Sequence, residues 1–82
     1  MNPNNINEIH TIIEVVDGKE TGIMGIMTPI GMIQAAYSGK KPGVFEGMVE
    51  MAKVGVKQHR DNGENYGAVV VKFTGREVLQ VF

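Results

Sequence analysis

The sequence predicts a small α+β domain in which two helices pack on one face of a sheet, in the order β-β-α-α-β-β. Residues 9–16 and 66–73 are rich in β-branched side chains, which favours strands. Between them, apolar residues recur at helical spacing over residues 42–61. At 82 residues the chain makes one domain, which we place at residues 8–82, after a flexible arm at residues 1–7.

The first predicted unit is a β-hairpin. Its first strand runs over residues 9–16 and is followed by a turn signal, Asp17-Gly18-Lys19. A second strand follows over residues 20–27. Gly22 and Gly25 interrupt this strand, which predicts a bulge or a close backbone approach.

A short, buried helix is predicted next. Thr28-Pro29 has the form of an N-cap followed by a first helical residue. Ile30, Ile33 and either Gln34 or Tyr37 recur at helical spacing, and Gly39 supplies a stop.

The long helix is predicted to begin at Pro42 and to end at Asn62-Gly63. Its apolar side carries Val44, Met48, Met51, Ala52 and Gly55. Its other side carries the opposite-charge pairs Glu50–Lys53 and Lys57–Asp61. Three glycines, Gly43, Gly47 and Gly55, lie roughly on one face, and each costs about 1 kcal/mol of helix preference. Packing on the sheet and contact with a second subunit would each offset that cost.

Two strands complete the expected fold. Residues 66–73 form an unbroken apolar run, which predicts a strand buried on both faces. Residues 74–76 turn the chain into a last strand over residues 77–82, with an apolar edge that a neighbouring subunit could cover. Because a chain this small has no cysteine to staple it, we expect a homo-oligomer.

Composition excludes several classes of partner. A formal net charge of −1 argues against a nucleic-acid binder. Residues 1–5 lack the layout of a secretory signal, and the apolar region at residues 23–37 is too short and interrupted to span a bilayer. We therefore expect a soluble, cytoplasmic protein without a membrane partner.

Catalytic and metal-binding patterns are not found in the sequence. Ser38 is the only serine and has no histidine near it in sequence, and the glutamates are scattered and typical of solvated positions. His10 and His59 form no ligand cluster, and we expect a structural role for His59. The methionine pairs Met24/Met27 and Met48/Met51 have a spacing that could suit Cu(I), but core packing is the simpler interpretation. The protein is thus not expected to be an enzyme or to hold a cofactor or a metal.

One segment suggests a ligand. Ser38-Gly39-Lys40-Lys41-Pro42-Gly43 leads into the long helix, whose first backbone N–H groups are unpaired and carry partial positive charge. The P-loop order is absent, so an ordinary connector with solvated lysines is the alternative. Arg60 and Arg76 could complete an anion clamp, or could simply be solvated. The candidate ligand-binding residues are Ser38, Gly39, Lys40, Lys41, Gly43, Arg60 and Arg76.

The chain resembles the YbjQ family, which is labelled as heavy-metal-binding. The likeness lies in the glycine-rich loop at residues 38–43, the helix at 45–62 and the strand Tyr66-Gly67-Ala68-Val69-Val70-Val71. The opening strands at residues 12–16 and 20–25 are also similar. The resemblance implies an α+β subunit that closes into a ring, most often a pentamer. This chain departs from the family in a shortened segment before the loop and in lacking the longer C-terminal part.

Three functions follow as hypotheses. The first is a non-catalytic oligomer that holds an anionic, nucleotide-like molecule between subunits, in the manner of a phage sponge that sequesters an immune signalling nucleotide. The second is a metal-binding or metal-response protein, as the family label implies. The third is a structural ring that binds no ligand.

Overall fold

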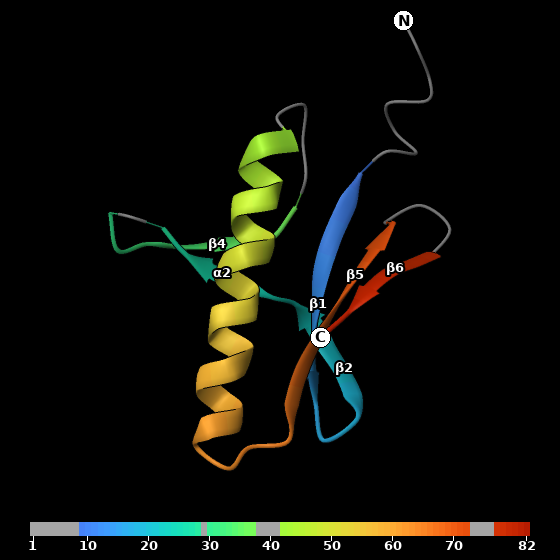
Figure 1. Ribbon diagram of the computed structural model, residues 1–82. Coiled ribbons are helices and arrows are strands. Elements are labelled where there is room, and N and C mark those ends of the chain that lie inside the picture. The colour runs from blue at the N-terminus through green and yellow to red at the C-terminus, as the bar shows by residue number, and fades with distance from the viewer. Residues whose placement is uncertain (1–8, 29, 38–41, 73–76) are drawn as a thin grey trace, which may run out of the picture.

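The computed structural model describes residues 9–28, 30–37, 42–72 and 77–82 and confirms the α+β class. Within these residues the order is β-β-β-β-α-β-β (Figure 1). The elements are β1 (His10–Val16), β2 (Lys19–Ile23), β3 (Gly25–Met27), β4 (Ile33–Ala35), α2 (Pro42–Asp61), β5 (Tyr66–Lys72) and β6 (Glu77–Val81). The predicted arm at residues 1–7 and the predicted turn at 74–76 lie outside the described residues.

The main sheet has four antiparallel strands in the order β2-β1-β5-β6. Helix α2 packs on β5 and on β3, and the core lies between them. Ile12 on β1 and Ala52 on α2 are fully buried at its centre. On the opposite face of the sheet Ile13 and Val71 are buried as well. The predicted burial of the strand at residues 66–73 on both faces is therefore confirmed for β5, and β1 beside it also has buried residues on both faces.

The first hairpin is confirmed, although its second strand ends at Ile23 and not at residue 27. Asp17 and Gly18 have φ values of 53° and 79°, as the positive φ angles of a two-residue type I′ turn require. The register of β1 against β2 shifts between Glu14 and Val15, and Gly22, opposite Glu14, has a φ of 144°. The glycine in the second strand thus accompanies a β-bulge, as predicted.

The predicted helix at residues 28–37 is wrong, because this segment closes and continues a two-stranded ribbon, β3–β4. Thr28 N–H donates to Met32 O at 2.7 Å, and Met32 N–H donates to Thr28 Oγ1 at 3.1 Å. Gly31 adopts a φ of 83°, which a helix interior does not allow. The Thr28 hydroxyl does accept a hydrogen bond from a backbone N–H, as an N-cap side chain would. In this structure, however, the bond stabilises the loop between β3 and β4 and not the start of a helix. Pro29 and Gly39 lie outside the described residues.

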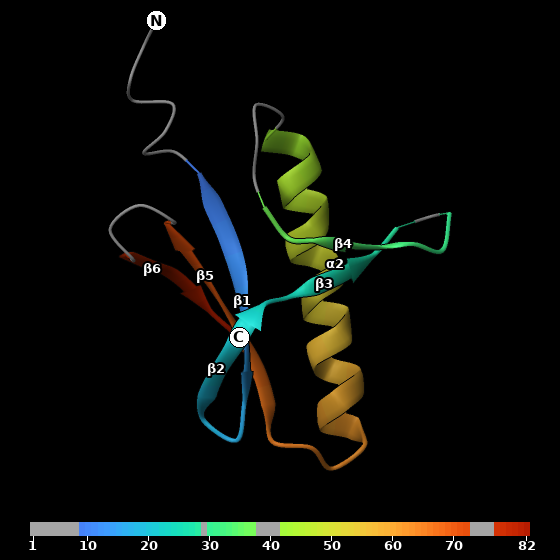
Figure 2. The same cartoon turned by 180° about the vertical axis from the view of Figure 1, so that it is seen from behind.

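The ribbon grows out of the main sheet where β2 ends. Met24 N–H donates to Ile12 O at 2.8 Å, and Ile12 N–H donates to Ala36 O at 3.1 Å. Thr11, which is buried, donates its hydroxyl to the same Ala36 carbonyl at 2.8 Å. The predicted second strand therefore divides at Met24, and the ribbon crosses α2 and projects beyond it (Figures 1 and 2).

The long helix is confirmed, with 20 residues from Pro42 to Asp61. The predicted pairs are present, with Lys53 Nζ 3.4 Å from Glu50 Oε2 and Lys57 Nζ 2.8 Å from Asp61 Oδ2. Gly63, at a φ of 84°, ends the helix. Among the described residues no helix is long and apolar enough to cross a membrane.

Candidate functional site

Only part of the predicted anion-binding site lies within the described residues. Gly43 lies in the first turn of α2 and is exposed, and beyond its chain neighbours and the backbone of its own helix no described atom lies within 4 Å of the position its Cβ would take. The first turn carries no acidic residue, so no carboxylate of that turn competes with a bound anion for the free backbone N–H groups. The other residues predicted here, Ser38, Gly39, Lys40, Lys41 and Arg76, lie outside the described residues.

Arg60 lies at the opposite end of the helix. At a rise of 1.5 Å per residue, its backbone is about 25 Å from that of Gly43. Its Nε donates to the backbone oxygen of Tyr66 at 2.8 Å and so fastens the end of α2 to the start of β5. A single chain therefore does not bring Gly43 and Arg60 into one site, and a site that uses both requires two copies.

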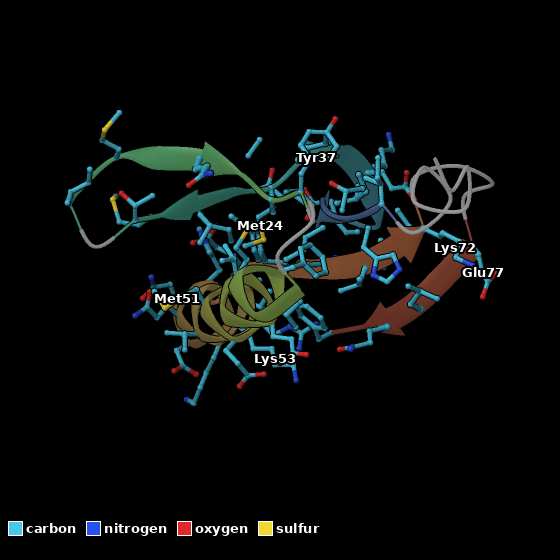
Figure 3. The ribbon with its side chains drawn as sticks, turned by 90° about the horizontal axis from the view of Figure 1, so that it is seen from above. Met24, Tyr37, Met51, Lys53, Lys72 and Glu77 are labelled. Atoms are coloured by element: carbon cyan, nitrogen blue, oxygen red, sulfur yellow. The ribbon has the colours of Figure 1, made fainter. Side chains whose placement is uncertain are left out.

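An open, apolar groove lies between the ribbon and the N-terminal half of α2. Its volume is about 270 Å³. Its lining residues are Ile26, Met27, Thr28, Gln34, Val44, Gly47, Met48 and Met51. Gly47 leaves the helix backbone uncovered there, since no described atom of another part of the chain approaches its Cβ position within 4 Å. Figure 3 shows Met24 between ribbon and helix, and Met51 on the part of the helix that faces away from the sheet.

Helix α2 carries a second apolar stripe beside its buried one. This second stripe consists of residues at helical spacing: Val44, Gly47, Met51 and Val54. Val44 is 54% exposed, Met51 is 49% exposed and Val54 is 50% exposed. The prediction that Met51 packs in the core with Met48 is therefore wrong for Met51, whereas Met48 is buried. Gly47 lies open on this stripe and is not used for packing on the sheet.

The ribbon is apolar and exposed. Met27, Ile30, Met32 and Ile33 are between 52% and 81% exposed. No residue from 21 to 37 carries a charge. The ribbon and the second stripe together leave seven large apolar residues between 49% and 81% exposed: Met27, Ile30, Met32, Ile33, Val44, Met51 and Val54. Exposed apolar residues that gather on neighbouring elements are typical of interaction surfaces.

A polar cluster lies at the other end of α2. Glu14 Oε1 accepts from Thr21 Oγ1 at 2.6 Å, and Glu14 Oε2 accepts from Tyr66 Oη at 2.5 Å. His59 stacks on the Tyr66 ring with centroids 4.0 Å apart, and its Nδ1 lies 2.9 Å from Glu64 Oε1. Glu14 is therefore bound rather than solvated, and the expected structural role of His59 agrees with these contacts.

The hydrogen bonds in this cluster change two pKa values. Those from Thr21 and Tyr66 lower the pKa of Glu14 below 4.5. Burial, followed by the bond to Glu14, raises the pKa of the Tyr66 hydroxyl above its ordinary value of 10.0. The tyrosine hydroxyl thus keeps its proton and donates a hydrogen bond to the carboxylate of Glu14. This bond stabilises the fold and leaves neither group poised as a base. Sequence reasoning missed this pair because its members are 52 residues apart.

Metal ligands are dispersed among the described residues, where no group of three His, Cys, Asp or Glu side chains is found. The His10 ring packs edge-on against Phe45, with centroids 5.9 Å apart. Met24 is buried, as predicted for core packing, whereas Met27 is exposed, so the prediction of core packing is wrong for Met27.

Two regions of the described structure therefore carry candidate chemistry. The N-terminal half of α2 has open surface, an apolar groove and an acid-free helix end. The polar cluster at the other end uses its side chains to bind one another. No protein-family model, curated protein or solved structure matches this chain, so the resemblance to the YbjQ family stays a prediction.

Proposed function

We propose that the chain is a non-catalytic subunit of a homo-oligomer that binds an anionic, nucleotide-like small molecule between subunits, at the N-terminal end of α2. The observation that supports this most directly is the openness of that end. Gly43 and Gly47 leave the helix backbone approachable, and the first turn has no carboxylate to repel an anion.

The chemistry of this helix end suits phosphate. Unpaired N–H groups point along the axis of the helix, and Lys40 and Lys41 precede its first residue in sequence. A hydrogen bond to a charged group contributes about 1.5–3 kcal/mol, so two or three of them give roughly millimolar to micromolar binding. Contacts from a second subunit would bring the affinity into a useful range, which is the reason for placing the ligand between subunits.

The test is calorimetry of the purified protein against cyclic nucleotides and ADP-ribose-type nucleotides. We expect heat with at least one of them, and its loss in the double variant Lys40→Ala/Lys41→Ala. The matched control is Lys53→Ala/Lys57→Ala, which removes the same charge from exposed positions on the far side of α2. Absence of heat with every nucleotide, or equal loss in both double variants, would reject the proposal.

Recovery of the bound nucleotide and native mass spectrometry distinguish the possible biological roles. A nucleotide that binds and is recovered chemically unchanged fits sequestration of a signalling molecule. An oligomer that carries no small molecule in native mass spectrometry of freshly purified protein fits the ligand-free structural ring.

A second candidate function is binding of a soft metal, because Met27, Met48 and Met51 all line the groove. Thioether sulfur selects Cu(I) over Zn(II). Equilibrium dialysis should then retain Cu(I) and not Zn(II), and Met51→Leu should reduce retention while filling the same space. Equal retention by Met51→Leu and the unsubstituted protein would exclude the groove as the site.

A further inference from the structure

The tip of the β3–β4 ribbon is the most exposed apolar part of the described chain. Ile30 is 81% exposed and Met32 is 62% exposed. The helix-facing side of the ribbon is already in use, since Met24 and Ile26 are buried against α2. The ribbon passes the helix and projects beyond it, so its tip does not fold back on its own groove (Figures 1 and 3).

The groove on the same chain is apolar, like the ribbon tip, and could accommodate it. Apart from Thr28 and Gln34 its lining is apolar, and its volume of about 270 Å³ has room for a few aliphatic side chains. Gly47 forms part of it, and no described atom of another part of the chain lies within 4 Å of the Cβ position there. An apolar side chain could thus reach the helix backbone.

We infer that the ribbon tip of one copy inserts into the groove of a second copy. Tip and groove lie on the same chain, and each side of the contact supplies only one of them. When the contact repeats from copy to copy, every chain therefore covers both its exposed tip, Ile30 and Met32, and its groove, which supports a second copy as the occupant. The uncharged surface of the tip meets the uncharged stripe of Val44, Met51 and Val54, so no charge is buried in the contact.

The contact is heterologous, because tip and groove are different surfaces of one chain. Every copy then offers one tip and one groove, and repetition of the contact gives a ring where the rotation closes. The inserted tip would lie about one helical turn from Gly43, since the groove includes Val44 and Gly47. The inference rests on the proposed function in placing the ligand between subunits, and it names the surfaces that bring the subunits together.

Two variants separate the tip from the groove. Ile30→Asp puts a charge on the tip at a position already in water. Gly47→Leu fills the groove from the helix, and it should not disturb the fold because the site is open and leucine favours helix. The control is Val81→Asp, the same kind of change at a 75% exposed apolar position on β6. Circular dichroism checks that each variant is folded.

Sedimentation velocity and native mass spectrometry then measure assembly. We expect an oligomer for the unsubstituted protein and for Val81→Asp, and monomers for Ile30→Asp and Gly47→Leu. A mixture of the two monomeric variants should form a 1:1 dimer and nothing larger, because only one intact tip and one intact groove remain to meet. The same protein solutions are titrated with nucleotide, so that an intact oligomer that binds no nucleotide is recognised as a failure of the proposed function and not of the interface.

Several outcomes would overturn the inference. A monomeric unsubstituted protein removes the interface altogether. Oligomers of folded Ile30→Asp or Gly47→Leu, or dissociation caused by Val81→Asp, would show that copies meet elsewhere. A mixture of the two variants that stays monomeric would also contradict the inference, because an intact tip and an intact groove are both present in it and do not bind each other.

Discussion

The hydrogen bond between Tyr66 and Glu14 makes a quantitative test of the fold. It ties β5 to β1 through a donor and an acceptor 2.5 Å apart, and Tyr66→Phe removes only this hydroxyl. The phenylalanine ring keeps the position from which Tyr66 stacks on His59. A hydrogen bond to a charged group is worth about 1.5–3 kcal/mol, and water can partly replace it at the half-buried Glu14. We therefore expect the free energy of unfolding at pH 7 to fall by about 1–2 kcal/mol.

The pH dependence of the free energy of unfolding tests the same hydrogen bond independently. Because the folded-state pKa of Glu14 is lowered, its carboxylate contributes stability that is present above pH 4.5 and is lost as the pH falls through the folded-state pKa. Tyr66→Phe removes one of the two bonds that lower this pKa and moves it back toward 4.5. The difference in stability between the two proteins should thus be largest near pH 7 and should shrink in acid.

Urea unfolding followed by circular dichroism from pH 3 to pH 8 measures both effects. One protein concentration is used throughout, because assembly would make stability depend on it. A double-mutant cycle with Glu14→Gln should give a coupling free energy of about 1 kcal/mol at pH 7. A stability difference that is equal at pH 3 and pH 7, together with zero coupling, would refute a bond from the hydroxyl to the carboxylate.

Four further predictions use the same unfolding measurements. Above pH 10.0 the protein should lose stability that Tyr66→Phe does not lose, because the raised pKa of Tyr66 keeps its proton bound in the folded state alone. Gly47→Ala should add up to about 1 kcal/mol, measured at a concentration low enough to avoid assembly, since its Cβ position is open. Gly67→Ala should cost about 1–3 kcal/mol, because its Cβ would lie 2.8 Å from the backbone oxygen of Phe82. Ile12→Ala should cost about 2–5 kcal/mol, since Ile12 is fully buried where the ribbon joins the sheet.

The elements that the sequence predicted correctly carry local signals. Asp17-Gly18 marks a hairpin turn by the conformations that these residues adopt easily, and the structure has both at positive φ. The pairs Glu50–Lys53 and Lys57–Asp61 mark one face of the long helix, and both are formed. In each case residues a few positions apart determine the outcome.

The wrongly predicted helix shows where local signals conflict. Thr28 can cap a helix or fix a loop, because its hydroxyl oxygen accepts a backbone N–H in both. Ile30 and Ile33 have helical spacing, but Ile33 pairs across the ribbon with Met27. Strand pairing with a distant partner decided between the two, since Ile12 binds both Met24 and Ala36. That contact is invisible to a reading of neighbouring residues.

The candidate site was predictable in one part and hidden in another. The helix end at Gly43 follows from Pro42 and from the apolar repeat behind it. The polar cluster required knowledge that β1 lies beside β5, which brings Glu14 to Tyr66. No spacing in the sequence encodes that approach.

The width of the apolar arc on α2 carries information that its periodicity alone does not. At 100° per residue, the apolar and glycine positions from Val54 round to Val49 span roughly 220°, whereas the buried ones, from Met48 to Val49, span only about 100°. The sheet and the ribbon of the same chain cover only the narrower arc. The charged residues fall in the remaining part of the circle, so the surplus arc carries no charge. The surplus carries Val44, Met51 and Val54, which are about half exposed in a single chain. It is the surface that the proposed contact with the ribbon tip of another copy would cover.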